Sequence, residues 1–345
     1  MSSLRIEVPL SQNLANELIE FLTGIFGSPP DIQMETLLGN ENQHNRNLLY
    51  FSRRDRSLAG TCLLTISRTY PILGGLGEVA TDPSSRRTGI ATELCEQAVS
   101  DFQETGGQAL FLGTINPSAA RVYHRLGWRK LPGAGIMVNT TSRESPEEFL
   151  NDYFNYMGHT TSPDHPHRKP SEELNREEIT IHQGSPEFRI PIIPLIHTPH
   201  DNQILDANAR IFSRRYADPG GCMSLYPKYE GIARNGRGAW FVAYTNTERV
   251  VGISTVSLQQ SGSCQVDGFT HQLFSECMED LISTAMKWGA GSGASKVQAT
   301  VSIEDEDKQT FMESLGFRKD KAGDDFEVGG RVVASIRMER STSGL

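Results

Sequence analysis

Cysteine is scarce in this 345-residue sequence: there are five, and no two of them form a Cys-x-x-Cys pair. An odd count without paired spacing excludes a disulfide framework and the usual zinc motifs, and it indicates buried free thiols in a reducing compartment. No stretch approaches the ~18 consecutive apolar residues of a membrane-spanning helix. The first ten residues also lack the apolar run of a signal peptide. We therefore expect a cytoplasmic protein with no membrane partner.

Basic residues are also fewer than acidic residues in this sequence. The 33 Lys and Arg residues against 42 Asp and Glu give a formal net charge of −9. Domains that bind nucleic acid usually carry a basic surface, so we expect no nucleic-acid partner. An acidic surface suits cationic substrates such as amines, but it serves solubility equally well. Charge alone leaves both interpretations open.

The chain length predicts two domains, at roughly 100–200 residues for each. Between them, the segment 159–173 (HTTSPDHPHRKPSEE) is polar and rich in proline and histidine, which is typical of a linker. Its histidines, His159, His165 and His167, have no Cys or carboxylate partner at ligand spacing, so we predict no metal site. We place the first domain at 1–150, the linker at 151–177 and the second domain at 178–345.

Helical and strand-like patterns alternate in the first half. Helices are predicted over 13–26, 32–38, 89–104 and 118–126, and strands over 4–9, 48–52, 58–67, 78–81 and 110–115. Gly74, Gly75 and Gly77 are interpreted as a turn before the strand 78–81. The strand–helix–strand–helix order from residue 78 onward predicts a parallel strand pair.

The second half repeats this order. Strands are predicted over 179–183, 240–244, 250–258 and 296–302, and helices over 203–216 and 274–288. A last helix ends at Leu315-Gly316-Phe317, which matches Leu126-Gly127-Trp128 of the first half. The shared order indicates a tandem duplication.

The run Arg86-Arg87-Thr88-Gly89-Ile90-Ala91 lies between a predicted strand and a predicted helix. Small residues at the helix start leave backbone N–H groups exposed at the positive end of the helix dipole, which favours an anion. Arg86 and Arg87 add positive charge beside it. The pattern predicts a cradle for a diphosphate.

A second motif begins about thirty residues later, at Asn116, which follows a strand and precedes a helix. Asn116 suits a helix cap and a polar anchor. Tyr123 lies two turns into that helix, so its hydroxyl can point towards the gap between the two predicted strands.

Together the two segments resemble the main motifs of the GNAT superfamily of N-acetyltransferases. Its pyrophosphate loop reads R/Q-x-x-G-x-G/A. Its later motif reads N-x-x-A-x-x-x-Y-x-x-x-G-F, with Trp128 here in place of the commoner Phe. The resemblance covers 4–140 well and 178–340 in outline. It implies an α/β (α+β) fold of two tandem GNAT-like domains, each with a mixed, centrally splayed β-sheet flanked by helices.

The same resemblance implies acetyl-CoA as cosubstrate and direct acetyl transfer to a primary amine, on a small molecule or a peptide. It assigns cofactor contacts to Val79, Ala80, Thr81, Arg86, Arg87, Thr88, Gly89, Ile90, Ala91, Thr92, Asn116, Ser118, Ala119 and Tyr123. In that assignment the amides near Gly89 hold the pyrophosphate and the strand near Val79 pairs with pantetheine. Tyr123 protonates the departing thiolate, which a phenol of pKa ~10 can do along a short hydrogen bond.

The general base is less well defined. Glu78, just upstream of the cofactor strand, is the candidate, with water as the alternative. Strand alternation puts Glu78 on the face of Ala80, and the sequence does not say which face meets the substrate.

The second half lacks the R-x-x-G-x-A motif. Aligning Leu315-Gly316 with Leu126-Gly127 puts Met312 in the place of Tyr123 and Asp305 in that of Asn116. A thioether cannot donate a proton, so we predict a degenerate domain that binds no cofactor and shapes the substrate cleft. A non-catalytic acyl-CoA-binding regulatory protein, and a transferase of a longer acyl group, stay open as alternatives. The sequence also leaves open a monomer or a homodimer.

Overall fold

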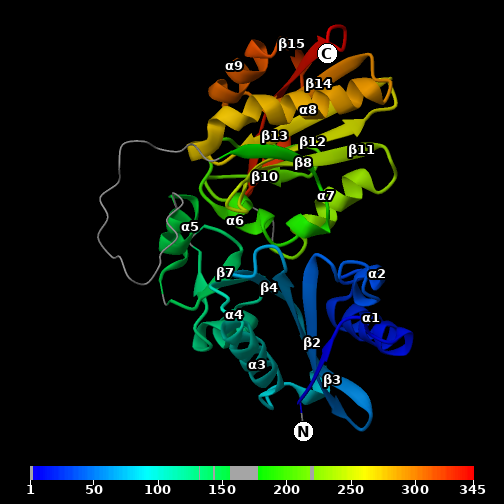
Figure 1. Cartoon of the computed structure of the whole chain (residues 1–345), viewed down its shortest axis with the longest axis vertical. Coiled ribbons are helices and arrows are strands. Elements are labelled where there is room, and N and C mark those ends of the chain that lie inside the picture. Colours follow the sequence, from blue (N-terminus) through cyan, green and yellow to red (C-terminus); the bar gives the residue numbers. More distant parts are fainter. Residues whose placement is uncertain (1–2, 132, 143, 156–177, 218–220) are drawn as a thin grey trace.

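The computed structural model describes residues 3–131, 133–142, 144–155, 178–217 and 221–345. It consists of two lobes stacked along the long axis, each built on a seven-stranded mixed sheet with flanking helices (Figure 1). The tandem α/β architecture predicted from the sequence is therefore confirmed. The first residues of the predicted linker belong to helix α5 (Pro146–Asn155). The rest of that linker, including His159, His165 and His167, lies outside the described residues.

The first sheet has the strand order β1-β2-β3-β4-β5-β7-β6. Its strands are β1 (Ser3–Glu7), β2 (Asn45–Arg54), β3 (Ser57–Ser67), β4 (Leu73–Thr81), β5 (Ala109–Gly113), β6 (Arg129–Lys130) and β7 (Ile136–Thr140). The helices are α1 (Gln12–Phe26), α2 (Met34–Leu37), α3 (Ile90–Glu104) and α4 (Pro117–Arg125). Ser11 caps α1, and Gly27 ends it in the left-handed conformation (φ 74°), which glycine adopts without strain.

The two central strands of the first sheet separate along their length. β4 and β5 pair in parallel only where Leu73, Gly74 and Gly75 face Ala109, Leu110 and Phe111. β4 then continues to Thr81, and its further pairs are with β3 alone. The sheet is thus splayed at its centre, and α4 begins shortly after β5 ends.

The second sheet has the order β15-β18-β14-β13-β12-β11-β8. Its strands are β8 (Ile179–Gln183), β11 (Gly238–Thr245), β12 (Val250–Leu258), β13 (Ser263–Thr270), β14 (Lys296–Ser302), β15 (Arg318–Ala322) and β18 (Ser335–Ser341). Two short hairpins accompany it, β9 (Ile204–Asp206) with β10 (Ile211–Phe212) and β16 (Phe326–Val328) with β17 (Arg331–Val333). The helices are α6 (Ile192–His197), α7 (Leu225–Ala233), α8 (Met278–Gly291) and α9 (Glu306–Ser314). Strands β13 and β14 are again parallel over a short stretch, 263–265 against 296–298.

The second lobe packs against one face of the first sheet. Leu73, Ala109 and Phe111 of β4 and β5 belong to one buried core with Ile190 and Leu225 of the second lobe. Alternate residues of the same strands point to the opposite face, where α3 and α4 cover them. The α1 side of β2 and β3 forms a third core. The splay of β4 and β5 therefore opens beside the interface between the lobes.

Two sequence predictions of local structure are wrong. Residues 203–216 are not helical but contain β9 and β10, because this segment is tied to the second sheet by buried polar contacts described below. Gly74, Gly75 and Gly77 do not form a turn but lie inside β4. A Cβ at Gly74 would lie 2.7 Å from a Leu110 methyl carbon, so close packing explains this glycine. The sequence also gave no prediction for strands β6, β7, β13, β15, β16, β17 and β18 or for helices α5, α6 and α7.

Candidate active site

A cavity of about 340 Å³ lies at the splay of β4 and β5. Its walls come from β4, β5, the start of α4, the α1–α2 loop and a segment of the second lobe. The lining includes Asp31, Gly77, Glu78, Val79, Leu112, Thr114, Asn116, Ala119, Tyr123, Gly221, Cys222 and Met223. The cavity therefore joins both lobes at the point where the central strands separate.

A β-bulge directs Glu78 into this cavity. Leu63 of β3 faces Gly77, whereas Thr61 faces Ala80, so β4 carries one extra residue between these pairs. Glu78 takes a left-handed φ of 51°, and its carbonyl accepts a hydrogen bond from the Thr61 hydroxyl at 2.8 Å. The bulge breaks strand alternation: Ala80 is buried in the core on the α1 side, while Glu78 lines the cavity.

Among the described residues, the Glu78 carboxyl has only one hydrogen-bond donor. Its Oε1 accepts one hydrogen bond, from the Ile32 amide at 3.2 Å. Burial raises the pKa of Glu78 from its ordinary 4.5 to about 7; the Ile32 hydrogen bond opposes the shift and the charge of Asp31 adds to it. A carboxyl with a pKa near neutrality can take up and release a proton at working pH, as a general base requires.

Tyr123 faces the same cavity from α4. The residue is 6% exposed, and its ring lies 6.2 Å from the Trp128 ring, centroid to centroid. Burial and the nearby thiols of Cys95 and Cys62 raise the pKa of Tyr123 above its ordinary value of 10, so the hydroxyl remains protonated. Within the described residues it has no hydrogen-bond partner. Because a buried tyrosine hydroxyl usually finds a partner, this one is available to a bound group.

The predicted diphosphate cradle forms the entry to α3. Gly89 caps the helix in the left-handed conformation (φ 92°), and apart from the adjoining backbone no described atom lies within 4 Å of the position a Cβ would take. The first intrahelical bond runs from the Glu93 amide to the Gly89 carbonyl. The amides of Ile90, Ala91 and Thr92 precede it and have no intrahelical acceptor. Arg86 and Arg87 are exposed on the loop before them.

The cavity brings together five of the predicted site residues: Glu78, Val79, Asn116, Ala119 and Tyr123. Asn116 also caps α4, accepting from the Ser118 amide at 2.9 Å. The remaining predicted residues lie outside its lining. They are Ala80 and Thr81 at the end of β4, Ser118 in the exposed first turn of α4, and Arg86, Arg87, Thr88, Gly89, Ile90, Ala91 and Thr92 at the start of α3.

Sequence reasoning missed the lining residues that come from elsewhere in the chain. Asp31 follows Pro29 and Pro30 in the α1–α2 loop, and Cys222 and Met223 belong to the second lobe. No motif marks these positions, because their role depends on how the lobes pack. The paired prolines, which fix the loop backbone, were the one available signal.

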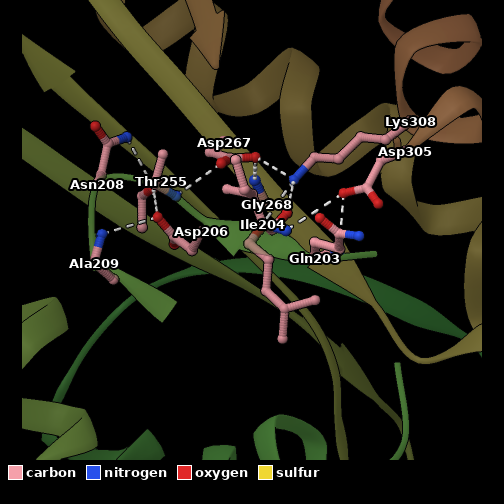
Figure 2. A network of polar contacts seen from close by, with 12 residues as sticks. Gln203, Ile204, Asp206, Asn208, Ala209, Thr255, Asp267, Gly268, Asp305 and Lys308 are labelled. Carbon is pink, nitrogen blue, oxygen red and sulfur yellow. Dashed lines mark hydrogen bonds and ion pairs between the residues drawn. The ribbon is translucent and has the colours of Figure 1, made fainter. Parts of the chain in front are cut away.

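At the equivalent place in the second sheet, polar side chains bind the backbone of strand β9. Asp305 and Lys308 align with Asn116 and Ala119 of the first lobe, and Asp267 lies two residues past the last parallel pair, as Gly77 does. Figure 2 shows Asp305 and Lys308 reaching the backbone of Ile204, with Asp267 beside the Lys308 ammonium group. The positions that line a cavity in the first lobe therefore carry, in the second lobe, polar side chains that contact the protein's own backbone.

These contacts are short and buried. The Lys308 Nζ donates to the carbonyl oxygens of Ile204 and Leu205, at 2.7 and 3.2 Å, and lies 2.6 Å from the Asp267 carboxylate. Asp305 accepts from the Ile204 amide at 3.3 Å and from the Gln203 amide at 2.8 Å. Strand β9 is thus bound between the start of α9 and β13.

Comparison with known proteins identifies the class of the first lobe. Residues 12–128 match the model of the acetyltransferase (GNAT) family, so the chain contains a domain of this family. No curated protein matches the chain. None of the described helices is both long and apolar enough to cross a membrane. No group of three or more His, Cys, Asp or Glu among the described residues is placed to hold a metal ion.

Solved structures similar to this chain include a GNAT-family acetyltransferase from Streptococcus pneumoniae, with 13% identity, a TM-score of 0.36, and coverage of 48% of this chain and 99% of that chain. The spermidine/spermine N-acetyltransferase SpeG from Vibrio cholerae, in complex with manganese ions, has 14% identity, a TM-score of 0.37 and coverage of 48% and 93%. An IAA acetyltransferase from Bacillus cereus has 18% identity, a TM-score of 0.28 and coverage of 33% and 85%. Likenesses this distant carry no information about substrate.

Proposed function

We propose that this protein transfers an acetyl group from acetyl-CoA to a primary amine by direct transfer in a ternary complex. The observation that carries the proposal is that Glu78 and Tyr123 line one cavity at the splay of β4 and β5. One residue has a pKa near 7 and the other keeps its proton, so they suit the roles of base and acid. The family of the first lobe supports acyl transfer as the reaction class.

The start of α3 fits the diphosphate of a coenzyme A molecule. Its unused amides, the open space beside Gly89 and the exposed Arg86 and Arg87 provide hydrogen-bond donors and positive charge together. Val79, Ala80 and Thr81 on β4, with Asn116, Ser118 and Ala119 on α4, would hold the rest of the molecule. When bound, acetyl-CoA supplies the acyl group as a reactive thioester.

The chain's own groups would then manage two protons. An amine acceptor is an ammonium ion in water and must lose a proton before its nitrogen can attack; the Glu78 carboxylate would take that proton. The Tyr123 hydroxyl would donate a proton to the thiolate that leaves. Positioning both partners in one cavity accounts for much of the expected rate gain.

The charge of the cavity supports an amine as the acceptor. Glu78 and Asp31 contribute two carboxylates, and the described lining contains no Lys, Arg or His. Lys228 and Arg189 are close enough to affect the pKa of Asp31, but Arg189 is already engaged by Glu41. A lining of this kind favours a cation.

We also propose that the second domain, at 178–345, binds no coenzyme A. Lys308, Asp267 and strand β9 occupy the gap that the first domain, at 1–150, keeps open. Calorimetric titration with acetyl-CoA should therefore give one site per chain. Two sites, or one site that survives Gly89→Glu, would contradict this division.

Activity is tested with acetyl-CoA and a panel of primary amines, including n-butylamine, 1,4-diaminobutane and a lysine-containing peptide. Thiol release is followed continuously, and the acetylated product is identified by mass spectrometry. Product formation supports the proposal. Tight acetyl-CoA binding without transfer to any amine would instead indicate an acyl-CoA-binding protein, and preferred turnover of a longer acyl-CoA would change the donor.

A further inference from the structure

Met223 of the second lobe lies against β4 of the first lobe, beside the Glu78 wall of the cavity. Gly75 and Gly77 leave the space that its side chain fills. A Cβ on Gly75 would lie 2.2 Å from the Met223 Sδ, and one on Gly77 would lie 3.3 Å from its Cγ. Any larger residue at Gly75 would therefore have to displace the thioether.

We infer that Met223 determines which amines the site accepts, by limiting the bulk that fits next to the reacting nitrogen. The inference rests on the proposed function. Met223 lines the cavity together with Gly77 and Glu78, which are consecutive in β4, so its side chain borders the place where a nitrogen meets the Glu78 carboxylate. The favoured acceptors are slender amines, unbranched at the carbon that bears nitrogen.

The second lobe holds this segment firmly. The neighbouring Cys222 is 1% exposed, and Leu225, at the start of α7, is fully buried in the core shared by both lobes. The amide of Leu225 donates to the Cys222 carbonyl at 3.3 Å. A methionine side chain is itself flexible, but its backbone here is fixed relative to β4. The lobe without the acid–base pair would thereby set the selectivity of the lobe that has it.

The test compares n-butylamine with its branched isomer sec-butylamine. Met223→Ala should raise the ratio of kcat/KM for sec-butylamine over n-butylamine by about 10-fold or more, the effect expected for room for one methyl group. Met223→Leu, which keeps the volume, should leave the ratio near that of the wild type. Met286→Ala, a substitution in the core of α8, controls for general loosening of the second lobe.

A double substitution gives a second readout. Gly75→Ala should push the thioether into the cavity and lower kcat/KM for n-butylamine, and Gly75→Ala with Met223→Ala should restore it to the Met223→Ala value. Strictly additive effects, or an unchanged amine ratio in a folded Met223→Ala protein, would overturn the inference. If the wild type acetylated no amine in the panel, the proposed function itself would fail, which is a distinct result.

Discussion

The Arg189 guanidinium donates to both oxygens of the Glu41 carboxylate, at 2.6 and 2.7 Å, across the interface between the lobes. The Arg189 side chain is 3% exposed and that of Glu41 is 9% exposed. The Arg189 guanidinium also stacks on the Tyr226 ring, 4.2 Å from its centroid. This buried pair fixes the lobe that carries Met223 against the lobe that carries Glu78.

Glu41→Gln should therefore lower the free energy of unfolding by about 3–5 kcal/mol, because a buried guanidinium loses its counter-charge. The matched control is Glu17→Gln, which breaks the bidentate pair with Arg53, at 2.7 and 2.6 Å but about one third exposed. That change should cost no more than about 1 kcal/mol. Denaturant unfolding of both variants measures the difference; equal losses would show that the interface pair has no special role.

Tyr123→Phe removes the proposed acid and little else. Turnover should fall by ~10²-fold or more, since general acid catalysis contributes on this scale, while acetyl-CoA affinity barely changes. Steady-state kinetics and calorimetric titration check the two parts. His124→Phe, on the exposed side of the same helix, is the control. Wild-type turnover in Tyr123→Phe would remove this residue from the mechanism.

Gly89→Glu places bulk and negative charge where the diphosphate is expected, so acetyl-CoA binding should be lost. Gly106→Glu is a close control, because Gly106 also has a positive φ (81°) and open space around it, at the other end of α3. Both variants bear the same backbone strain and the same added charge. Only Gly89→Glu should fail in the titration; equal loss in both would place the diphosphate elsewhere.

Glu78 should impose a pH dependence on activity. With its pKa raised to about 7, the carboxylate can act as the proposed base only above that value, so kcat/KM should fall as pH falls through 7. Glu78→Gln should lower activity and remove that limb of the profile. An identical profile in the variant would favour water as the base.

The contribution of Glu78 to folding stability should fall as pH rises, whereas activity should rise. A carboxyl whose pKa is higher in the folded state than in the unfolded chain binds its proton more tightly when folded. The stability it contributes is present below pH ~4.5 and is lost as pH rises through about 7. Glu78→Gln should thus gain stability relative to the wild type between pH 5 and pH 8, which thermal unfolding at the two values measures.

The sequence patterns were sufficient for the tandem fold and for placing Tyr123 on the helix that follows β5, because strand and helix periodicity fix local geometry. They did not predict the bulge that turns Glu78 away from the Ala80 face, which depends on the register with β3. The glycine pattern predicts a turn at Gly75, but the packing of Met223 is what excludes a side chain there. The helix predicted over 203–216 is wrong for a similar reason. Buried partners such as Asp267 determine the conformation of this segment, whatever its local preference.

The core shared by both lobes has a practical consequence for protein production. A fragment ending near residue 150 would leave Leu73, Ala109 and Phe111 without the cover that Ile190 and Leu225 provide. An open apolar sheet face of this kind promotes self-association in water. Residues 1–150 expressed alone should therefore aggregate, and co-expression with residues 178–345 as a separate chain should restore the cover and keep the first lobe in solution.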